Sequence, residues 1–169
     1  MKTDTRKIVY SALFAALIAV SIYIFHIPAG KGIIHLGDAI IYLGAVMLPF
    51  PYGIASAAVG GALADLVSGY AVYIIPTFII KAINAMCFYA AKSGGTKIIT
   101  KRSIAAAVVS SIVTVVGYYL FAALYYHGWK SQLIITVPGN LVQAGGSFAA
   151  FLAIGLVFDK AGVAKKIKL

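Results

Sequence analysis

The sequence predicts an all-α integral membrane protein: a single domain over residues 1–169, with six transmembrane helices and both termini in the cytoplasm. The composition indicates the class, because 62% of the residues are hydrophobic and the mean hydropathy is +0.99. A soluble domain is nearer half apolar, with about a quarter of its residues charged. Here only 11% are charged, glutamate is absent, and most charges stand in short clusters between long apolar runs. Lipid, rather than one soluble core, hides this much apolar surface.

Six apolar runs are candidate spans, since a spanning helix needs about 20 mostly apolar residues. The first follows basic residues but lacks a clear small-residue cleavage site, which predicts a retained helix rather than a signal peptide. The second is short, and Pro49-Phe50-Pro51 predicts a tight turn that joins it to the third as a helical hairpin. The last is long, and Pro138-Gly139 predicts a break near its start. The predicted spans cover residues 7–25, 35–49, 52–68, 73–91, 103–126 and 132–158.

The distribution of basic residues predicts the orientation. With the N-terminus inside, eleven Lys or Arg residues lie in the cytoplasm, while only Lys31 and Lys130 lie outside. This excess follows the positive-inside rule and accounts for the net charge of +10. No basic face with interleaved aromatics occurs, so nucleic acid is not an expected partner. The eleven residues are Lys2, Arg6, Lys7, Lys92, Lys97, Lys101, Arg102, Lys160, Lys165, Lys166 and Lys168.

Several kinds of site have no counterpart in the sequence. There is no glycine-rich phosphate loop, so the chain is not expected to hydrolyse ATP by itself. No nucleophile elbow, HExxH motif or pair of catalytic carboxylates occurs, which argues against an enzyme. The single cysteine, Cys87, lies in an apolar run, and the three histidines lack metal-ligand spacing. We therefore expect neither a metal nor a cofactor. No internal inverted repeat, frequent in secondary carriers, is apparent.

Charged side chains inside the spans are few, and such residues usually face the bundle interior and mark function. Lys81 lies about 12 Å from the start of its span at ~1.5 Å per residue, with Thr77 and Asn84 on the same helix face. Asp38, beside His35, and Asp65 are predicted nearer the outer ends of their spans. Other polar or aromatic candidates at the outer half are Tyr70, Trp129, Asn140, Gln143 and Ser147.

A small planar heterocycle would suit this set of side chains, with aromatic walls for stacking and amides and an ammonium for orientation. Each feature also has a structural explanation. Lys81 would form an ion pair with Asp38 or Asp65, and Asn140 and Gln143 would link helices by hydrogen bonds. Trp129 and its neighbouring tyrosines would form an interfacial belt. Residues 65–70 would form a helix-ending turn, with Gly69 as the stop.

Two ladders of small residues run along the first predicted helix. Spacings of four place each ladder on one face, where small side chains let another helix approach closely. One ladder consists of Ser11, Ala15 and Ala19, and the other of Ala12 and Ala16. Packing inside the bundle and docking of a different protein both remain open for this helix. For the third helix, whose small residues include Ser56, Gly60 and Gly61, packing inside the bundle is the preferred interpretation.

Five stretches of the sequence carry a family pattern: residues 35–40 (HLGDAI), 51–53 (PYG), 61–70 (GALADLVSGY), 76–81 (PTFIIK) and 138–143 (PGNLVQ). They resemble the substrate-binding S components of energy-coupling factor (ECF) vitamin transporters. The resemblance is nearest to the riboflavin, pyridoxine and hydroxymethylpyrimidine branch, and it extends over nearly the whole chain. The small-residue ladder of the first helix is also similar to the face on which S components meet their coupling subunit.

The resemblance implies a multi-pass protein of a prokaryotic plasma membrane that captures a B-vitamin-like heterocycle from outside. Pyridoxine or hydroxymethylpyrimidine is the first expectation, because few charged groups are available; riboflavin is next. A stand-alone secondary carrier of a small polar solute is the alternative. The implied partners are a transmembrane coupling subunit and two ATP-binding subunits, which supply the ATP hydrolysis. The implied substrate-binding residues are Lys81, Asn84, Tyr118, Trp129, Asn140 and Gln143, while Asp38 and Asp65 are structural candidates.

Overall fold

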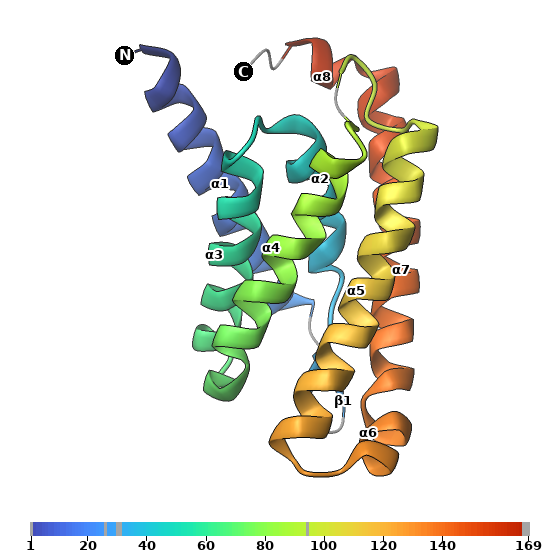
Figure 1. Cartoon of the computed structure of the whole chain (residues 1–169). Coiled ribbons are helices and arrows are strands. Elements are labelled where there is room, and N and C mark those ends of the chain that lie inside the picture. The colour runs from blue at the N-terminus through green and yellow to red at the C-terminus, as the bar shows by residue number, and fades with distance from the viewer. Residues whose placement is uncertain (1, 26, 30–31, 94, 167–169) are drawn as a thin grey trace.

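The protein, seen in a computed structural model, is a bundle of long helices with one small β-hairpin (Figure 1). The structure describes residues 2–25, 27–29, 32–93 and 95–166; Lys31 and Lys168, which entered the charge distribution, lie outside these residues. The elements are α1 (Lys2–Ile24), β1 (Ile27–Ala29), β2 (Gly32–Ile34), α2 (Gly37–Met47), α3 (Tyr52–Val67), the short 3₁₀ helix η1 (Ala71–Tyr73), α4 (Ile74–Ala90), α5 (Lys101–Tyr125), α6 (Trp129–Ile135), α7 (Val137–Lys160) and α8 (Val163–Lys166).

Within the part of the chain that the structure describes, four helical segments are long and apolar enough to cross a membrane. They are α1 from Thr5 to Ile24, η1 with α4, α5, and α7. The other two apolar helices are shorter, with 11 residues in α2 and 16 in α3. The prediction of a multi-pass helical membrane protein therefore agrees with the structure, and four of its six predicted spans have spanning length.

The helix boundaries extend beyond the first predicted span, and the predicted break near the start of the last span is confirmed. The first helix begins at Lys2, because the basic residues before the apolar run already form its first turns. The sixth predicted span is two helices, α6 and α7, which are separated at Thr136. Pro138 lies in the first turn of α7, where its missing N–H would have had no helical partner. The proline thus marks a helix start rather than an irregular entry.

Both ends of the described chain lie at the same end of the bundle. The start of α1 and the short α8 are at the upper end in Figure 1, while α6 and the β-hairpin lie toward the other end. In the hairpin, Ile27 pairs with Ile34 and Ala29 with Gly32 in antiparallel register. The hairpin turns the chain back from the far end of α1, so that α2 begins inside the bundle instead of at its edge (Figure 1).

Helix α2 is the central element of the bundle. Eight of its eleven residues are buried, and it packs against α1, α3, α4 and α7. At ~1.5 Å per residue it is only about 16 Å long, roughly half the thickness of a hydrocarbon core. Its side chain Tyr42 packs against Phe88 and Phe151, with ring centroids 5.2 and 5.7 Å apart. This aromatic contact ties α2 to α4 and α7.

Helix α3 joins its neighbours through adjacent glycines. A Cβ at Gly60 would lie 2.7 Å from the carbonyl oxygen of Ala15, so this glycine allows α1 to approach closely. A Cβ at Gly61 would lie 2.9 Å from Cγ of Lys81, which brings α4 equally near. The predicted packing role of the small residues in α3 is confirmed at these two positions.

Both predicted turns around α3 are confirmed. Residues 48–51 join α2 to α3 and place Tyr52 at the first position of the next helix. At the other end, Gly69 has φ +80° and follows the last residues of α3. The N–H of Tyr70 donates to the carbonyl of Asp65 at 2.8 Å, and that of Gly69 donates to Leu66 at 3.3 Å. This is a Schellman ending, which requires a positive φ at the glycine.

Candidate functional site

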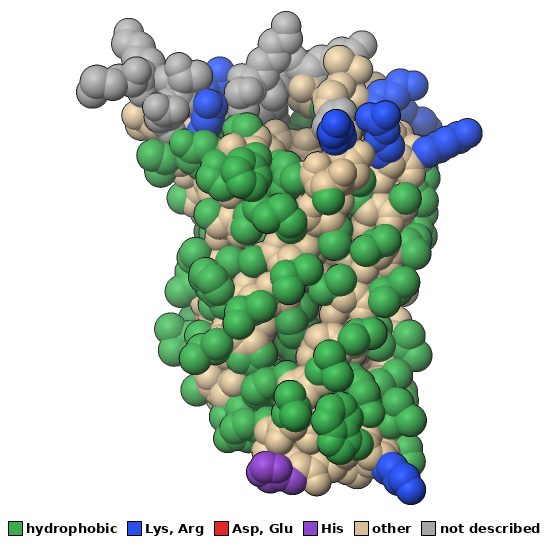
Figure 2. All heavy atoms as spheres, in the orientation of Figure 1, with side chains coloured by type: hydrophobic (Ala, Val, Ile, Leu, Met, Phe, Trp, Pro, Cys, Tyr) green, Lys and Arg blue, Asp and Glu red, His purple; other side chains and the backbone are tan. Residues whose placement is uncertain are grey.

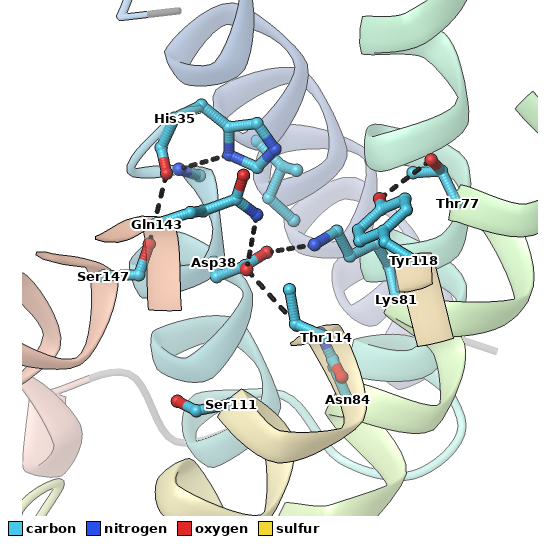
Figure 3. Close-up of polar contacts among 12 residues, drawn as sticks. His35, Asp38, Thr77, Lys81, Asn84, Ser111, Thr114, Tyr118, Gln143 and Ser147 are labelled. Carbon is cyan, nitrogen blue, oxygen red and sulfur yellow. Dashed lines mark hydrogen bonds and ion pairs between the residues drawn. The ribbon is translucent and has the colours of Figure 1, made fainter. Parts of the chain in front are cut away.

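A buried ion pair lies at the centre of the bundle. Nζ of Lys81 on α4 is 2.6 Å from Oδ1 of Asp38 on α2, and neither side chain is exposed. Asp38 stands in the first turn of α2, where the positive end of the helix dipole favours a carboxylate. Of the two partners that the sequence left open for Lys81, the structure selects Asp38. Figure 3 shows the pair between α2 and α4.

Two further side chains complete the surroundings of Asp38. Nε2 of Gln143 on α7 donates to Oδ2 at 3.1 Å, and Oγ1 of Thr114 on α5 lies 3.5 Å from the same oxygen. Both side chains are buried, with 1% of Gln143 exposed. One carboxylate therefore joins four helices, and Lys81 and Gln143 donate to it and stabilise its negative charge.

Asn84 extends this network along α5. In the amide orientation that satisfies both ends of the side chain, its nitrogen donates to the carbonyl of Ser110 at 3.1 Å. Its oxygen then accepts from Thr114 Oγ1 at 2.8 Å. Asn84 is completely buried, so these bonds hold α4 against α5 in an apolar setting where unpaired amides are costly.

Tyr118 borders Lys81 on a second side. Its hydroxyl is 2.9 Å from Oγ1 of Thr77, and its ring centroid is 5.1 Å from the Lys81 ammonium. A cation at this distance from an aromatic face is attracted by the ring. Tyr73 packs nearby, with its ring centroid 6.2 Å from that of Tyr118. The predicted combination of an ammonium with aromatic walls is thus present at this point.

His35 and Ser147 hold the start of α2. The N–H of Gly37 donates to Nδ1 of His35 at 3.1 Å, and the Ser147 hydroxyl donates to the His35 carbonyl at 3.4 Å. His35 itself is buried, with 5% exposed. These bonds connect α7 with the chain just before Asp38 (Figure 3).

Asp65 lies apart from the Lys81–Asp38 pair, on the side of α3 that faces α4. It stands one turn beyond Gly61, the residue that packs against Lys81 and Thr77. Only 6% of Asp65 is exposed, and its Oδ2 has no hydrogen-bond partner among the described residues. The hydroxyl of Ser68, one turn further, is likewise unpartnered within that part of the chain. Acceptor capacity therefore remains beside the network.

Three predicted site residues do not join the network around Asp38. Trp129 is 51% exposed and packs edge-on against Tyr119, with centroids 6.0 Å apart. The Asn140 amide donates to the carbonyl of Thr136 at 3.0 Å, a bond within the α6–α7 break. Tyr70 is half-buried and precedes η1. Trp129 and Asn140 lie toward the end of the bundle that carries α6.

The charged groups of Asp38 and Lys81 meet although the sequence predicts different depths for the two residues in their spans. A 2.6 Å contact brings the ammonium and the carboxylate to one level in the bundle. The long lysine side chain can carry its charge away from the level of its own backbone. Counting residues along a span therefore predicts where a helix residue lies but not where its charge lies.

Sequence reasoning missed Thr114 and Ser110, although a signal was present. Ser103, Ser110, Thr114 and Tyr118 recur at spacings of seven and four along α5, and all four are buried. Such spacings place side chains on one helix face. A polar stripe in a helix otherwise rich in Ala and Val would have indicated the face that meets α4 and α2.

The two ladders of α1 separate in the structure. Ala15 is buried against Gly60, and the Ser11 hydroxyl donates to the carbonyl of Tyr52 at 2.9 Å, so these residues serve packing within the chain. Ala19 is half-buried, whereas Ala12 and Ala16 are exposed. The exposed ladder is the one still available to another protein.

These groups form a polar centre inside an apolar bundle. It offers an ammonium, a carboxylate, two amides and hydroxyls, which are the groups that orient a polar heterocycle by hydrogen bonds. Among the residues that the structure describes, no group of three or more His, Cys, Asp or Glu side chains suited to a metal occurs. The arrangement is suited to binding a polar ligand.

Residues 2–159 match the protein family described as "ECF-type riboflavin transporter, S component". The chain belongs to this family. S components are substrate-binding subunits of vitamin transporters, so this is a membrane transport protein rather than an enzyme. ECF S components act with a module of transmembrane and ATPase subunits. A search of curated proteins finds no match.

Proposed function

We propose that this S component captures a vitamin-like heterocycle from outside the cell and delivers it inward with the help of ATP-driven partners. The observation that carries the proposal is the buried centre formed by Asp38, Lys81 and Gln143 in a chain of the S-component family. Ionisable groups at such depth are costly in a membrane protein and mark substrate sites.

The proposed topology has six membrane-spanning segments with both termini in the cytoplasm of a prokaryotic cell. It is supported by the location of the start of α1 and of α8 at one end of the bundle (Figure 1). Figure 2 shows that Lys and Arg side chains gather at this end, whereas the opposite end carries few. The positive-inside rule makes the basic end cytoplasmic and places α6 and the β-hairpin outside.

Riboflavin is the first proposed substrate, in place of the smaller vitamins expected from charge alone. The family description supports it. Pyridoxine or hydroxymethylpyrimidine is the second candidate, because the polar centre is compact: Lys81, Asn84 and Gln143 are each at most 1% exposed. A small ligand needs little rearrangement of such a closed centre, whereas a flavin requires the outer ends of the helices to separate.

The proposed contacts divide into two groups. Lys81, Asn84, Tyr118 and Gln143 belong to or border the polar centre, with Thr77 beside them. Trp129 and Asn140 lie toward the α6 end of the bundle, where an arriving ligand would meet them before it reaches the centre. His35 and Asp38 position the first group, and Asp65 offers the unpartnered acceptor described above.

By analogy with the family, the proposed partners are a transmembrane coupling subunit and two ATP-binding subunits. The exposed residues Ala12 and Ala16 of α1 are the proposed docking ladder, since small side chains allow close helix approach. Ala15 and Ser11, which the sequence also offered, are occupied within the chain.

Binding to the purified chain tests the proposal. Mass spectrometry of the co-purifying small molecule identifies the ligand, and titration with riboflavin and with pyridoxine compares the two candidates. Gln143→Ala should weaken vitamin binding about tenfold, because the polar centre around Asp38 loses an amide that is proposed to hydrogen-bond the ligand. Gln132→Ala is the matched control, since Gln132 is equally buried but bonds locally to Thr136. Equal losses in both variants would refute the location of the site.

Uptake distinguishes the proposed importer from a stand-alone carrier. Vesicles that contain this chain alone should bind the vitamin but not accumulate it, and accumulation should require the coupling subunit, the ATPases and ATP. Accumulation by the chain alone would favour the secondary carrier that the sequence left as the alternative.

A further inference from the structure

A basic cluster lies where α5 begins and α7 ends. It consists of Lys97 in the α4–α5 connection, Lys101 and Arg102 in the first turn of α5, and Lys160 in the last turn of α7. All four side chains are exposed. Figure 2 shows Lys and Arg atoms gathered at this end of the molecule, with no acidic side chain on the visible face.

Asp159 brings these residues together but leaves most of their charge uncompensated. Its two carboxylate oxygens accept from the backbone N–H groups of Ile98 and Ile99, at 2.7 and 2.9 Å. The end of α7 is thereby attached to the segment that leads into α5. Both oxygens accept from the backbone, and among the described residues this carboxylate forms no ion pair with the basic cluster.

The attachment is reinforced locally. A Cβ at Gly155 would lie 2.4 Å from Cδ1 of Ile99, so α7 approaches the connection closely at this point. Ser103 donates to the carbonyl of Ile98 at 2.7 Å and forms a capping box with Thr100. The backbone that presents Lys97, Lys101 and Arg102 is therefore held rigidly, which lowers the entropic cost of binding a ligand there.

Apolar side chains continue directly from the basic cluster toward the middle of the bundle. On α5, Val108 and Ile112 follow Lys101 at spacings of seven and four, and they are 46% and 57% exposed. On α7, Leu156 and Val157 precede Lys160 by four and three residues and are 51% and 62% exposed. Spacings of three, four and seven place Lys101 and Lys160 on the same helix faces as these apolar neighbours.

We infer that this basic cluster, with the apolar faces of α5 and α7 beneath it, is a binding site for an anionic phospholipid. The phosphate would lie among Lys101, Arg102 and Lys160, where the guanidinium of Arg102 offers a bidentate fork. The acyl chains would lie along Val108, Ile112 and Leu156. Basic pockets between transmembrane helices above apolar surface bind anionic headgroups in this way. The inference depends on neither the identity of the vitamin nor its binding residues.

Lipid titration of the purified full chain tests the inference. Native mass spectrometry should show retention of phosphatidylglycerol over phosphatidylcholine. The triple variant Lys101→Gln, Arg102→Gln and Lys160→Gln should lower the affinity for phosphatidylglycerol on the order of a hundredfold, at about fivefold for each charge near the headgroup. Glycerophosphoglycerol without acyl chains should not compete at the lipid concentrations used, because the apolar contacts are missing.

Single variants keep the test informative if the triple variant is unstable. Arg102→Gln should lose about fivefold in affinity, and Arg102→Lys should lose less because it keeps the charge. Lys130→Gln removes the same charge from the α6 end and should change nothing. Equal losses in Arg102→Gln and Lys130→Gln, or equal retention of the two phospholipids by the wild type, would overturn the inference.

Discussion

The Lys81–Asp38 pair provides the sharpest test of how this bundle is held together. Replacement of Lys81 by Met preserves the length of the side chain but leaves Asp38 as a carboxylate with 0% exposure. Breaking a buried pair by removing one partner costs about 3–5 kcal/mol. Gln143 still donates to the carboxylate, so we expect a loss near the lower limit, about 3 kcal/mol.

The second single variant and the double variant complete a thermodynamic cycle. Asp38→Asn leaves the Lys81 ammonium buried without its ion-pair partner, with the ring of Tyr118 5.1 Å away. The double variant, Lys81→Met with Asp38→Asn, contains no buried charge at this point. Replacing a buried ion pair by neutral groups of similar volume is often neutral or stabilising. The double variant should therefore be more stable than either single variant.

Thermal unfolding in one detergent, with monodispersity as a check, measures the cycle. The single variants should unfold roughly 6–12 °C below the wild type, the shift that about 3 kcal/mol produces in a chain of this size. A coupling free energy under about 0.5 kcal/mol, meaning that the two losses simply add, would refute the reasoning. Vitamin titration of the double variant then separates two roles of Lys81: restored stability without binding identifies a ligand contact, and restoration of both identifies a structural one.

Three other predictions concern packing and docking. Gly60→Val should destabilise the protein by about 1–3 kcal/mol in thermal unfolding, because the new side chain meets the backbone of Ala15. Asp159→Ala should cost about 1.5–3 kcal/mol by the same assay, since two backbone N–H groups lose a charged acceptor. Ala16→Leu should leave vitamin binding unchanged and abolish co-purification with the coupling subunit. Ala16 is exposed, and the larger leucine side chain would keep the partner's helix away from α1.

Two of these variants, Gly60→Val and Ala16→Leu, have a matched control within the chain. Gly145 has no atom within 4 Å of an added Cβ, so Gly145→Val should be nearly neutral beside Gly60→Val. An Asp159→Ala variant as stable as the wild type would show that the α7 attachment contributes little. Leu17 is already large and exposed on α1, so Leu17→Phe should retain the partner; loss of the partner there too would point to a general effect on α1.

Local features of the fold were predictable because their causes are local. Long apolar runs give helical segments of spanning length at α1, at η1 with α4, at α5 and at α7. Gly69 ends α3 because a positive φ is needed at one position in a short turn. The break between α6 and α7 was foreseen near Pro138, although it falls at Thr136, just before the proline. Such features depend on residues within one or two turns.

The membrane class, the bias of basic residues toward one side and the set of polar residues inside the spans were determined by the sequence alone. It could not decide between Asp38 and Asp65 as the partner of Lys81, nor reveal Thr114 as a shared contact, because both depend on which helix faces meet. The tertiary structure decided these points through the β-hairpin that places α2 at the centre and the glycines of α3 that admit α1 and α4. Helix periodicity states which residues share a face, whereas packing of distant segments determines what that face contacts.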